Sequence, residues 1–559
     1  MRRWFLLSLY TVCMVGLLFR VIDLQVLNKE FLQNHGDARA LRVVKIPAHR
    51  GMITDRNGES LAISTPVNSI WAVPRKVIAA NSKLDKLAEY LEMDEKELTS
   101  LLNDRIGRQF VYLKRHVVPT LAEQVMLLDI PGISLQREYR RYYPAGEVTA
   151  HVLGFTNIDD SGQEGMELAY DSWLKGSPGS KRVLKDRLGR IVENIESITT
   201  PDPGNQLILA IDRRVQYLAY RELKSAVNHH KARAGTLVVL NVKTGEIIAM
   251  VGQPSYNPNN RTGLKSGYYR NRALTDVFEP GSTLKPFTIA TALESGLYDL
   301  ETTIDTRPGF FKVGDHIIRD HRDYGVIDLA TVIKKSSNIG ASKIALSLEP
   351  LDFWSMLAKV GFGQATGSGF PGEASGYLNP YNNWSEVEQA TMSFGYGISV
   401  TALQLAQAYI PFATDGMMLP ISFLKLTEKV SASRVFSTRV ARQVRAMLET
   451  VVQKGGTGNK AMVEGYRVAG KTGTVHKTVD GGYSEDRYLS LFAGMAPASN
   501  PRLIAVVIID EPKGDQYYGG LVAAPVFSNV MAGALRLLDI PPDNLPVLNG
   551  QVVATGRVY

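Results

Sequence analysis

The first long apolar run, Trp4–Phe19, contains no charged residue and follows two arginines. It is shorter than the roughly 20 residues that span a bilayer as a helix, but Arg20 can reach toward the headgroups and apolar positions continue beyond it. A cleaved signal peptide would need small residues at the end of the run, where bulky leucine and phenylalanine stand. We therefore expect an uncleaved transmembrane anchor over 4–24, with residues 1–3 in the cytoplasm by the positive-inside rule.

The segment from 25 to 205 is mixed and polar, with frequent turn signals and no pairing of a nucleophile with a base. Apolar and charged residues alternate at helical spacing over Ser82–Leu102. The Pro- and Gly-containing stretch Thr199–Gly204 is the best domain boundary. We predict a non-catalytic domain over 25–205, a second domain over 206–540 and a tail over 541–559.

The second domain shows sharper patterns. Short apolar runs bounded by turn residues predict strands, and longer apolar or capped stretches predict helices. The expected strands are Gln206–Ile211, Thr236–Leu240, Ile247–Val251, Val468–Ala469, Ser490–Ala493 and Leu503–Ile509, and the expected helices run from the cap Asp212 to about His229, over Phe287–Leu293 and over Pro525–Leu538. Strands at both ends with helices between them favour one sheet covered by helices, an α+β architecture.

Composition narrows the function classes. The 559-residue chain has a formal net charge of +8 but no Lys/Arg block of the kind that binds nucleic acid, so no nucleic-acid partner is expected. Cys13 is the only cysteine and lies within the apolar N-terminal run, so no intrachain disulfide can form. A cysteine-based zinc site is excluded, and the H-E-x-x-H pattern is absent.

Ser282 and Lys285 form an S-x-x-K pair that directly follows Pro280-Gly281. A helix can begin after this turn, and residues i and i+3 of a helix share a face, which sets the serine hydroxyl beside the lysine amine. Serine is a weak nucleophile that needs a base. Lysine serves as that base only if burial or a neighbouring cation lowers its pKa. The pair therefore predicts an activated serine nucleophile.

Two later elements complete a site. In Ser336-Ser337-Asn338 a hydroxyl can relay a proton to a leaving amine and the amide can hold a substrate carbonyl. In Lys471-Thr472-Gly473-Thr474 the lysine can anchor a carboxylate and depress the pKa of nearby amines, and the threonine hydroxyls can bind the same carboxylate. Gly473 has no side chain, so a substrate backbone can lie close to this strand. Backbone N–H groups of Ser282 and Thr474 are candidate oxyanion donors.

Each short motif alone is weak, because the chain contains a second copy of each. The second copies are Ser422–Lys425, Ser255–Asn257 and Lys243–Gly245. Only the set that begins at Ser282 has the order S-x-x-K, S-x-N, K-T-G-T, and this order carries the specificity. Other apparent motifs fail their context tests, among them a G-x-G-x-x-G at Gly367–Gly372, and His316 with His321 is more typical of a structural pair than of metal ligands.

The ordered motifs and their surroundings resemble class B penicillin-binding proteins, most closely the septal division type, the penicillin-binding protein 3 group. The likeness runs from the anchor to about residue 540. It rests on EPGSTLKPF (Glu279–Phe287), KSSNIG (Lys335–Gly340), AGKTGT (Ala469–Thr474), FPGEASG (Phe370–Gly376), SFGYGISVT (Ser393–Thr401), YYGGLVAAPVF (Tyr517–Phe527), RGMITDRNG (Arg50–Gly58) and GQEGMELAYD (Gly162–Asp171).

This resemblance implies a multidomain α+β protein: a transmembrane helix, an elongated α+β pedestal, and a penicillin-binding transpeptidase domain with a helix-covered antiparallel sheet and an all-helical subdomain. It implies a D,D-transpeptidase whose serine attacks the penultimate D-Ala of a peptidoglycan stem pentapeptide and passes the acyl group to an amine on an acceptor strand. β-Lactam antibiotics would acylate the same serine. No cofactor and no metal are implied.

The resemblance also assigns roles. Ser282 is the nucleophile, Lys285 the general base, and Ser336 and Asn338 assist proton transfer and positioning. Lys471, Thr472, Gly473 and Thr474 bind the terminal carboxylate, and Ser337 is grouped with the substrate-binding residues. The pedestal would dock a glycan-polymerising membrane protein and division-ring proteins, with the catalytic domain on the periplasmic side of the inner membrane.

Several alternatives remain open. An elongation-type enzyme of the same class usually carries Asp where Asn338 stands, and a paralogue with altered β-lactam affinity is not separable by sequence. A β-lactamase would need a deacylating glutamate, and neither Glu373 nor Glu388 lies in such a motif. A β-lactam-binding sensor on the same fold is the remaining alternative, and the intact motifs disfavour it.

Overall fold

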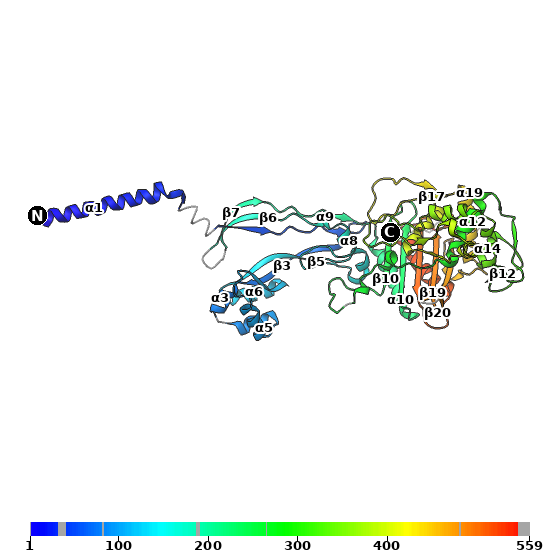
Figure 1. Cartoon of the computed structure of the whole chain (residues 1–559), viewed down its shortest axis with the longest axis horizontal. Coiled ribbons are helices and arrows are strands. Elements are labelled where there is room, and N and C mark those ends of the chain that lie inside the picture. The colour runs from blue at the N-terminus through cyan, green and yellow to red at the C-terminus, as the bar shows by residue number, and fades with distance from the viewer. Residues whose placement is uncertain are drawn as a thin grey trace. The chain divides into compact units, whose positions relative to one another are not determined.

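The apolar N-terminal run forms one long helix in the computed structural model. Helix α1 (Arg2–Ile22) continues into a π-helical turn, η1 (Asp23–Leu27), and none of its residues is buried (Figure 1). The structure describes residues 2–31, 41–80, 83–185, 191–263, 265–479 and 482–545. The predicted tail over 541–559 therefore lies mostly outside the described residues.

The chain divides into two compact units, each described here by itself. The first unit comprises 1–51, 64–142 and 172–205, and the second comprises 52–63, 143–171 and 206–559. Segments from the first half of the sequence thus group with the second unit. The domain limits expected from the sequence stay a prediction.

The first unit contains a three-stranded antiparallel sheet and a small helix-packed core. The sheet has the order β1 (Leu41–Ile46), β6 (Gly179–Lys185), β7 (Ile191–Thr199). The core buries side chains such as Ile70, Leu98 and Val125. The elements that supply this core are β3 (Ser60–Ala72), α3 (Pro74–Ala80), α4 (Leu84–Leu91), α5 (Glu95–Asn103), β4 (Val111–Val117), α6 (Pro119–Leu127) and β5 (Ile133–Tyr142).

The helical spacing noted over Ser82–Leu102 is realised as two helices, α4 and α5. Glu92 takes a left-handed backbone conformation with φ of 55° and ends α4, and the Asp94 side chain accepts the N–H of Lys96 to begin α5. Such a conformation interrupts a helix, because L-residues adopt it only singly.

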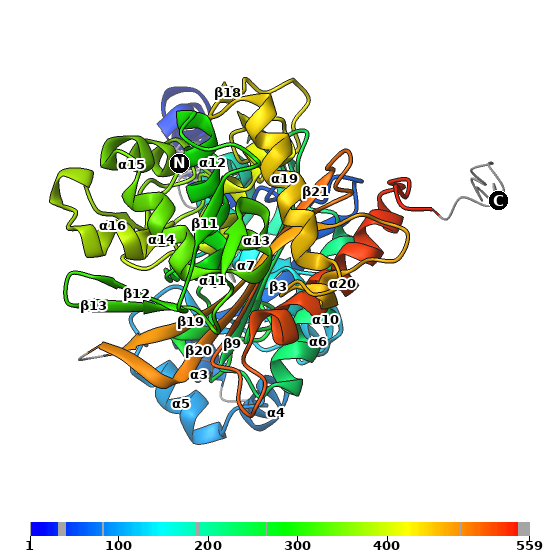
Figure 2. The same cartoon turned by 90° about the vertical axis from the view of Figure 1, so that its right-hand side faces the viewer.

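A five-stranded antiparallel sheet forms the centre of the second unit (Figure 2). Its order is β10 (Ile247–Gln253), β9 (Ala234–Asn241), β21 (Leu503–Asp510), β20 (Gly482–Ala496), β19 (Ala469–Val479). The two ends of this domain thus contribute to one sheet, as predicted. Two short strands of the same unit, β2 (Ile53–Thr54) and β8 (Leu207–Ile208), pair in parallel.

Both faces of this sheet are covered. Helices α10 (Arg213–His229) and α20 (Gly519–Leu537) pack against each other and against the sheet, and α11 (Arg272–Thr275) and α17 (Ala402–Ala408) also contact its strands. Every residue of β21 is buried. Burial on both faces explains why these strands read as continuous apolar runs instead of alternating patterns.

Helix α12 (Lys285–Ser295) is the buried centre of the helical part of this unit. The Phe287 ring packs against Phe362, Tyr409 and Phe412, at centroid distances of 5.5, 5.6 and 5.0 Å. A helix buried on nearly all sides is held firmly, so the turn that precedes it is fixed as well. It contacts α13 (Leu329–Lys335), α14 (Asn338–Leu346), α15 (Pro350–Lys359) and α19 (Thr438–Val452), and α16 (Glu386–Met392) packs against α14.

Two sequence predictions in this unit need correction. Of the strand expected over Gln206–Ile211, only β8 is strand, because Leu209 makes an isolated bridge to Leu424 instead of extending a ladder. The closing helix α20 begins at Gly519, and Pro525 lies inside it. A proline normally marks a helix start, and here burial of both flanks holds the helix through it.

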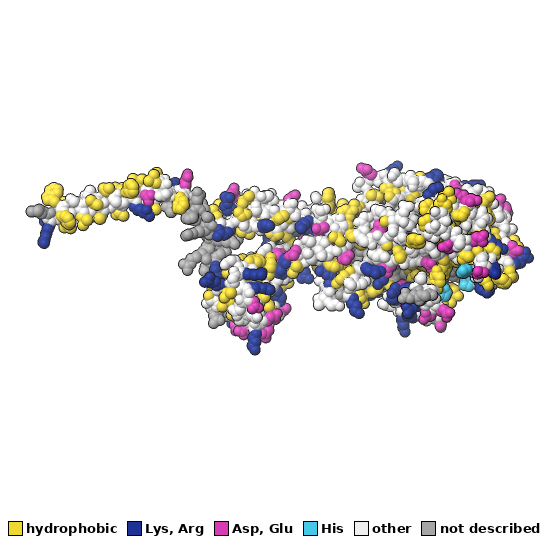
Figure 3. Space-filling view, in the orientation of Figure 1, with side chains coloured by type: hydrophobic (Ala, Val, Ile, Leu, Met, Phe, Trp, Pro, Cys, Tyr) yellow, Lys and Arg dark blue, Asp and Glu magenta, His cyan; other side chains and the backbone are white. Residues whose placement is uncertain are grey.

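Two described helices, α1 with its π-helical extension and α20, are long and apolar enough to cross a membrane. Of the apolar window in α20, 56% is buried within the second unit, whereas that of α1 is fully exposed. Hydrophobic side chains are spread along the visible surface of α1 (Figure 3). Only α1 therefore remains as a membrane span.

Candidate active site

Ser282 lies on a 3-10 turn, η4 (Gly281–Leu284), that leads directly into α12. The sequence predicted Ser282 and Lys285 on one helix, whereas the structure places the serine on the turn and the lysine at the start of α12. The two still face each other, because residues i and i+3 of a 3-10 helix eclipse. Ser282 is partly exposed, while Thr283, Leu284 and Lys285 are buried.

The turn between α13 and α14 carries the second motif. Ser336 ends α13 in a left-handed conformation with φ of 60°. Such a conformation is unusual for a residue other than glycine and is often found at functional sites. It directs both the hydroxyl and the carbonyl of Ser336 toward Lys285, at 3.1 and 2.8 Å from Nζ.

Four oxygens surround the Lys285 amine. Nζ lies 2.8 Å from the Ser336 carbonyl, 2.7 Å from Asn338 Oδ1, 2.9 Å from Ser282 Oγ and 3.1 Å from Ser336 Oγ. The two carbonyl oxygens can only accept, so they take both N–H groups of a neutral amine. Its lone pair is then free to accept the hydroxyl proton of Ser282.

Burial favours this neutral amine. Lys285 is fully buried, and desolvation, together with the nearby Lys471 cation, holds its pKa well below the ordinary value; Asp320 opposes the shift. This is the condition that a lysine base requires. The sequence predicted burial or a neighbouring cation as its cause, and here both lower the pKa.

Lys471 enters from strand β19 on the other side of Ser336. Its Nζ donates to Ser336 Oγ at 2.9 Å and to the Thr472 carbonyl at 3.1 Å. Burial lowers the pKa of Lys471 to about 7. The Ser336 hydroxyl therefore joins the two lysines, and the three predicted motifs meet at one point.

Gly473 lets strand β19 approach the nucleophile turn. A Cβ at this position would stand 3.2 Å from Thr283 Cγ2 and 3.3 Å from the Pro280 carbonyl. The structural need for glycine is thus packing against η4. Thr472 contacts Thr457 at 2.8 Å and Thr474 Oγ1 accepts the Gly519 N–H at 3.0 Å, so both hydroxyls lie near the start of α20.

The prediction for Ser337 needs correction. Its side chain is fully buried, donates to Asp320 Oδ2 at 2.5 Å and accepts the Gly340 N–H at 2.9 Å. These contacts make it the N-cap of α14. Its hydroxyl is part of the scaffold beneath the site and offers no surface to a substrate.

Asp320 is the site residue that sequence reasoning missed. Besides Ser337, it accepts the backbone N–H groups of Asn338 at 2.5 Å and Ile339 at 3.2 Å. Asp320 directly follows β13 (His316–Arg319). Its hydrogen bonds hold the first turn of α14, which carries Asn338. No sequence motif marks Asp320. An acidic side chain stabilises the start of a helix when it lies there, but Asp320 reaches the start of α14 only through the tertiary fold.

Asp320→Ala is expected to slow acylation of Ser282 by roughly tenfold, because Asn338 and Ser336 lose their fixed placement around Lys285, and to lower the free energy of unfolding by about 1–3 kcal/mol. Rates of labelling by a fluorescent penicillin and thermal unfolding measure the two effects. The matched control is Asp328→Ala, which removes the cap that α13 receives at the Thr331 N–H. That control is expected to lose stability alone; equal slowing in both variants would contradict a specific role for Asp320.

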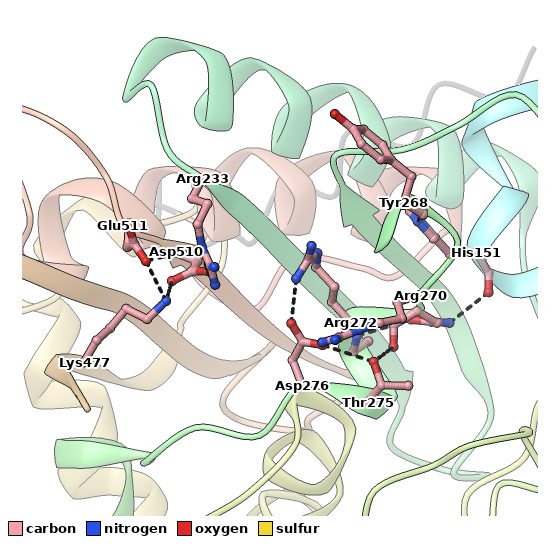
Figure 4. A network of polar contacts seen from close by, with 12 residues as sticks. His151, Arg233, Tyr268, Arg270, Arg272, Thr275, Asp276, Lys477, Asp510 and Glu511 are labelled. Atoms are coloured by element: carbon pink, nitrogen blue, oxygen red, sulfur yellow. Dashed lines mark hydrogen bonds and ion pairs between the residues drawn. The ribbon is translucent and has the colours of Figure 1, made fainter. Parts of the chain in front are cut away.

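An ionic network holds the far end of β19 (Figure 4). Lys477 donates to Asp510 at 2.7 Å and to Glu511 at 2.8 Å, and Arg233 donates to Asp510 Oδ2 at 2.6 and 2.9 Å. The network ties β19 to the start of β9 and the end of β21. It therefore fixes the strand that carries Lys471 at the end away from that lysine.

The second copies of the motifs have ordinary structural roles. The Ser422 hydroxyl donates to the Leu424 carbonyl, and Lys425 Nζ donates to the Arg56 carbonyl at 3.0 Å.

Among the described residues no group of three or more His, Cys, Asp or Glu side chains could hold a metal ion. The His321 ring lies 6.2 Å from the Tyr518 ring.

Two family models match the chain. The penicillin binding protein transpeptidase domain matches residues 235–532, and the penicillin-binding protein dimerisation domain matches residues 45–209. Among solved structures, the apo transpeptidase domain of Burkholderia pseudomallei penicillin-binding protein 3 is 44% identical with a TM-score of 0.56. The likeness covers 60% of this chain and 98% of that one.

Curated relatives are similar over nearly the whole chain. The probable peptidoglycan D,D-transpeptidase PbpC of Pseudomonas aeruginosa is 44% identical over 96% of this chain and 95% of its own length. The peptidoglycan D,D-transpeptidase FtsI of Escherichia coli is 44% identical over 95% of this chain and 90% of its own length. The probable peptidoglycan D,D-transpeptidase PenA of Neisseria meningitidis is 42% identical over 96% of this chain and 93% of its own length.

These relatives and the exposed α1 helix identify a membrane-anchored protein, and the fold and family expected from the sequence are confirmed. The partly exposed Ser282 beside the buried Lys285, the Ser336 hydroxyl between the two buried lysines and the matched domains lead to one assignment. The chain belongs to the penicillin-binding proteins that combine a dimerisation domain with a transpeptidase domain.

Proposed function

We propose that this protein is a peptidoglycan D,D-transpeptidase that cross-links stem peptides during septal cell-wall synthesis and is inhibited by β-lactams. The observation that carries the proposal is the partly exposed residue Ser282, whose hydroxyl lies 2.9 Å from the amine of the buried Lys285. The names of the relatives PbpC, FtsI and PenA support the reaction class.

Acylation follows from the placement of the proton acceptor. Ser282 Oγ attacks the penultimate D-Ala carbonyl while Lys285 takes the hydroxyl proton, and backbone N–H groups of Ser282 and Thr474 receive the oxyanion. The C–N bond then breaks, and the leaving D-Ala amine takes a proton relayed through the Ser336 hydroxyl. In the second half-reaction an acceptor amine loses its proton to the same relay and displaces Ser282 from the ester.

Lys471 is proposed to bind the terminal carboxylate of the donor, with the hydroxyls of Thr472 and Thr474. A protonated Lys471 next to Lys285 also keeps the base neutral by repulsion. Asn338 holds both the base and a substrate carbonyl, since its amide has more than one polar atom.

The pH dependence of acylation should report Lys471. Its pKa, lowered to about 7 by burial, means that the anchoring charge is present well below pH 7 and is lost as pH rises through that value. The second-order rate constant for acylation by an anionic penicillin is therefore expected to fall on the alkaline side near pH 7. Lys471→Arg keeps the cation at all accessible pH values. In this variant the rate constant for acylation is expected to show no fall near pH 7, even if its value differs from that of the wild type. The same fall near pH 7 in that variant would contradict the carboxylate-binding role of Lys471.

The direct test uses the full chain in neutral lipid nanodiscs. Incubation with a fluorescent penicillin is expected to give a covalent adduct that lasts many minutes, and mass spectrometry of the digest is expected to locate it on Ser282. Turnover of a D-Ala-D-Ala pentapeptide with an amine acceptor should release D-Ala and form the cross-linked product. Rapid release of hydrolysed penicillin would instead indicate a β-lactamase, and an adduct without peptide turnover would indicate a sensor.

The septal role has a cellular test. Depletion of the protein is expected to produce filaments, whereas rounded cells would indicate an elongation enzyme. We further propose a single-pass orientation in the inner membrane with the two units outside, supported by the arginines that precede the apolar run. A non-catalytic domain over 25–205 would then dock a glycan polymerase and division-ring proteins, and a transpeptidase domain would occupy 206–540.

A further inference from the structure

A broad groove lies on the second unit between helices α10 and α20, with a volume of about 1200 Å³. The two helices touch beneath it, because a Cβ at Gly533 would stand only 2.4 Å from Leu218 Cδ2. The floor is apolar and includes Tyr217, Leu218 and Leu537. Tyr217 is 55% exposed, a large aromatic side chain left open to solvent. This floor is thus suited to bury the apolar face of a ligand.

Four arginines border the same groove: Arg213, Arg214, Arg221 and Arg536. Two have ion-pair partners that are far less exposed than they are. Asp212 is fully buried below Arg214, whose side chain is 53% exposed, and Glu222 is 18% exposed beside Arg221 at 59%. Arg214 donates two N–H groups to Asp212, which orients the guanidinium. At these two positions the carboxylates therefore lie inside and the positive groups face the solvent. Arg213 differs, because its partner Glu59 is more exposed than the arginine and lines the groove together with Asp55.

Arg536 is the least compensated of the four. Its Nε donates to the Ala532 carbonyl at 3.1 Å, and the described part of the chain brings no carboxylate within ion-pair distance of it. A guanidinium held beside an apolar floor recognises a carboxylate with two parallel hydrogen bonds. The lining contains four arginines against the two carboxylates Asp55 and Glu59, so its excess positive charge complements an acidic ligand.

Shape and charge together favour one class of occupant. From Arg213 to Arg221 the wall formed by α10 extends about 12 Å at 1.5 Å per residue, which matches about two turns of a helix lying along it. A flat anionic membrane would not enter a concave groove, whereas a helix can lie along it. We propose that this groove docks an acidic amphipathic helix of a partner protein, apolar side chains on the floor and carboxylates on the arginine rim.

The groove also has a physical connection to the catalytic strand. Helix α20 contributes Gly533, Arg536 and Leu537 to the groove, and at its other end Gly519 donates its N–H to Thr474 Oγ1. An occupant at one end of a single buried helix is therefore connected to the K-T-G-T strand by a rigid element. The docking proposal does not depend on the catalytic one.

The test uses the full chain in phosphatidylcholine nanodiscs and a fluorescein-labelled helical peptide of about 14 residues, roughly four turns, with leucines on one face and glutamates flanking them. Anisotropy is expected to show saturable binding to the wild type. Arg221→Glu with Arg536→Glu is expected to weaken it by about tenfold or more, and Tyr217→Ala by several-fold. The matched control Arg439→Glu, an exposed charge on α19, is expected to bind as the wild type does.

Two further measurements make the outcome decisive. Labelling by a fluorescent penicillin at the wild-type rate confirms that each variant is folded. A scrambled peptide of the same composition lacks the apolar face and is expected to bind at least about tenfold more weakly. Equal binding of the scrambled peptide, equal binding by the double variant, or displacement of the peptide by phosphatidylglycerol vesicles would each overturn the proposal, the last in favour of a lipid surface.

Discussion

Ser282→Ala is expected to abolish covalent labelling by penicillin and to reduce peptide cross-linking by about 10⁶-fold, because the nucleophile of a covalent mechanism has no substitute. The fold should survive, since the only side-chain hydrogen bond shown for this hydroxyl is that with Lys285. Its loss costs about 1 kcal/mol or less. Gel fluorescence, product analysis and thermal unfolding measure the three quantities.

The chain supplies its own control for that substitution. Ser422 begins the second S-x-x-K and has a partly buried hydroxyl, but its partner Lys425 donates to a carbonyl elsewhere. Ser422→Ala should label and cross-link as the wild type does. Residual labelling of Ser282→Ala at a second serine would show that the nucleophile has been misassigned.

Lys285→Arg is expected to lower the rate of acylation by about 10³-fold or more while Ser282 stays in place. Arginine keeps the length and the hydrogen-bonding capacity but stays protonated at any accessible pH, so it cannot take the hydroxyl proton. The neutral amine of the wild type depends on full burial and on Lys471, and no guanidinium can reproduce it. Stopped-flow acylation with a chromogenic β-lactam measures the rate.

The matched change Lys425→Arg alters an exposed lysine of the second motif and should leave the rate unchanged. Raising the pH should not restore the acylation rate of Lys285→Arg. It would restore the rate of a variant in which a functioning base only had a raised pKa. Recovery of the acylation rate at alkaline pH would therefore argue against Lys285 as the proton acceptor.

The sequence by itself determined the family, the membrane helix and the central sheet, and it named the three motifs that the structure brings together. These follow from local features: an uncharged run, apolar periods, and three motifs in a fixed order. The contact between Ser282 and Lys285 is also a local feature, because residues three positions apart lie side by side in both a 3-10 helix and an α-helix. Element limits were less certain, as Gln206–Ile211 and the start of α20 show.

Only the tertiary structure decided which polar residues share the site and which lie beneath it. Asp320 has no motif of its own, and Ser337 differs from Ser336 only in the direction that a left-handed turn gives it. The neutral state of Lys285 likewise depends on burial and on a cation 186 positions away along the chain (471 − 285). Such contacts join segments distant in sequence, and no local pattern around Asp320 or Ser337 marks which distant group each of them contacts.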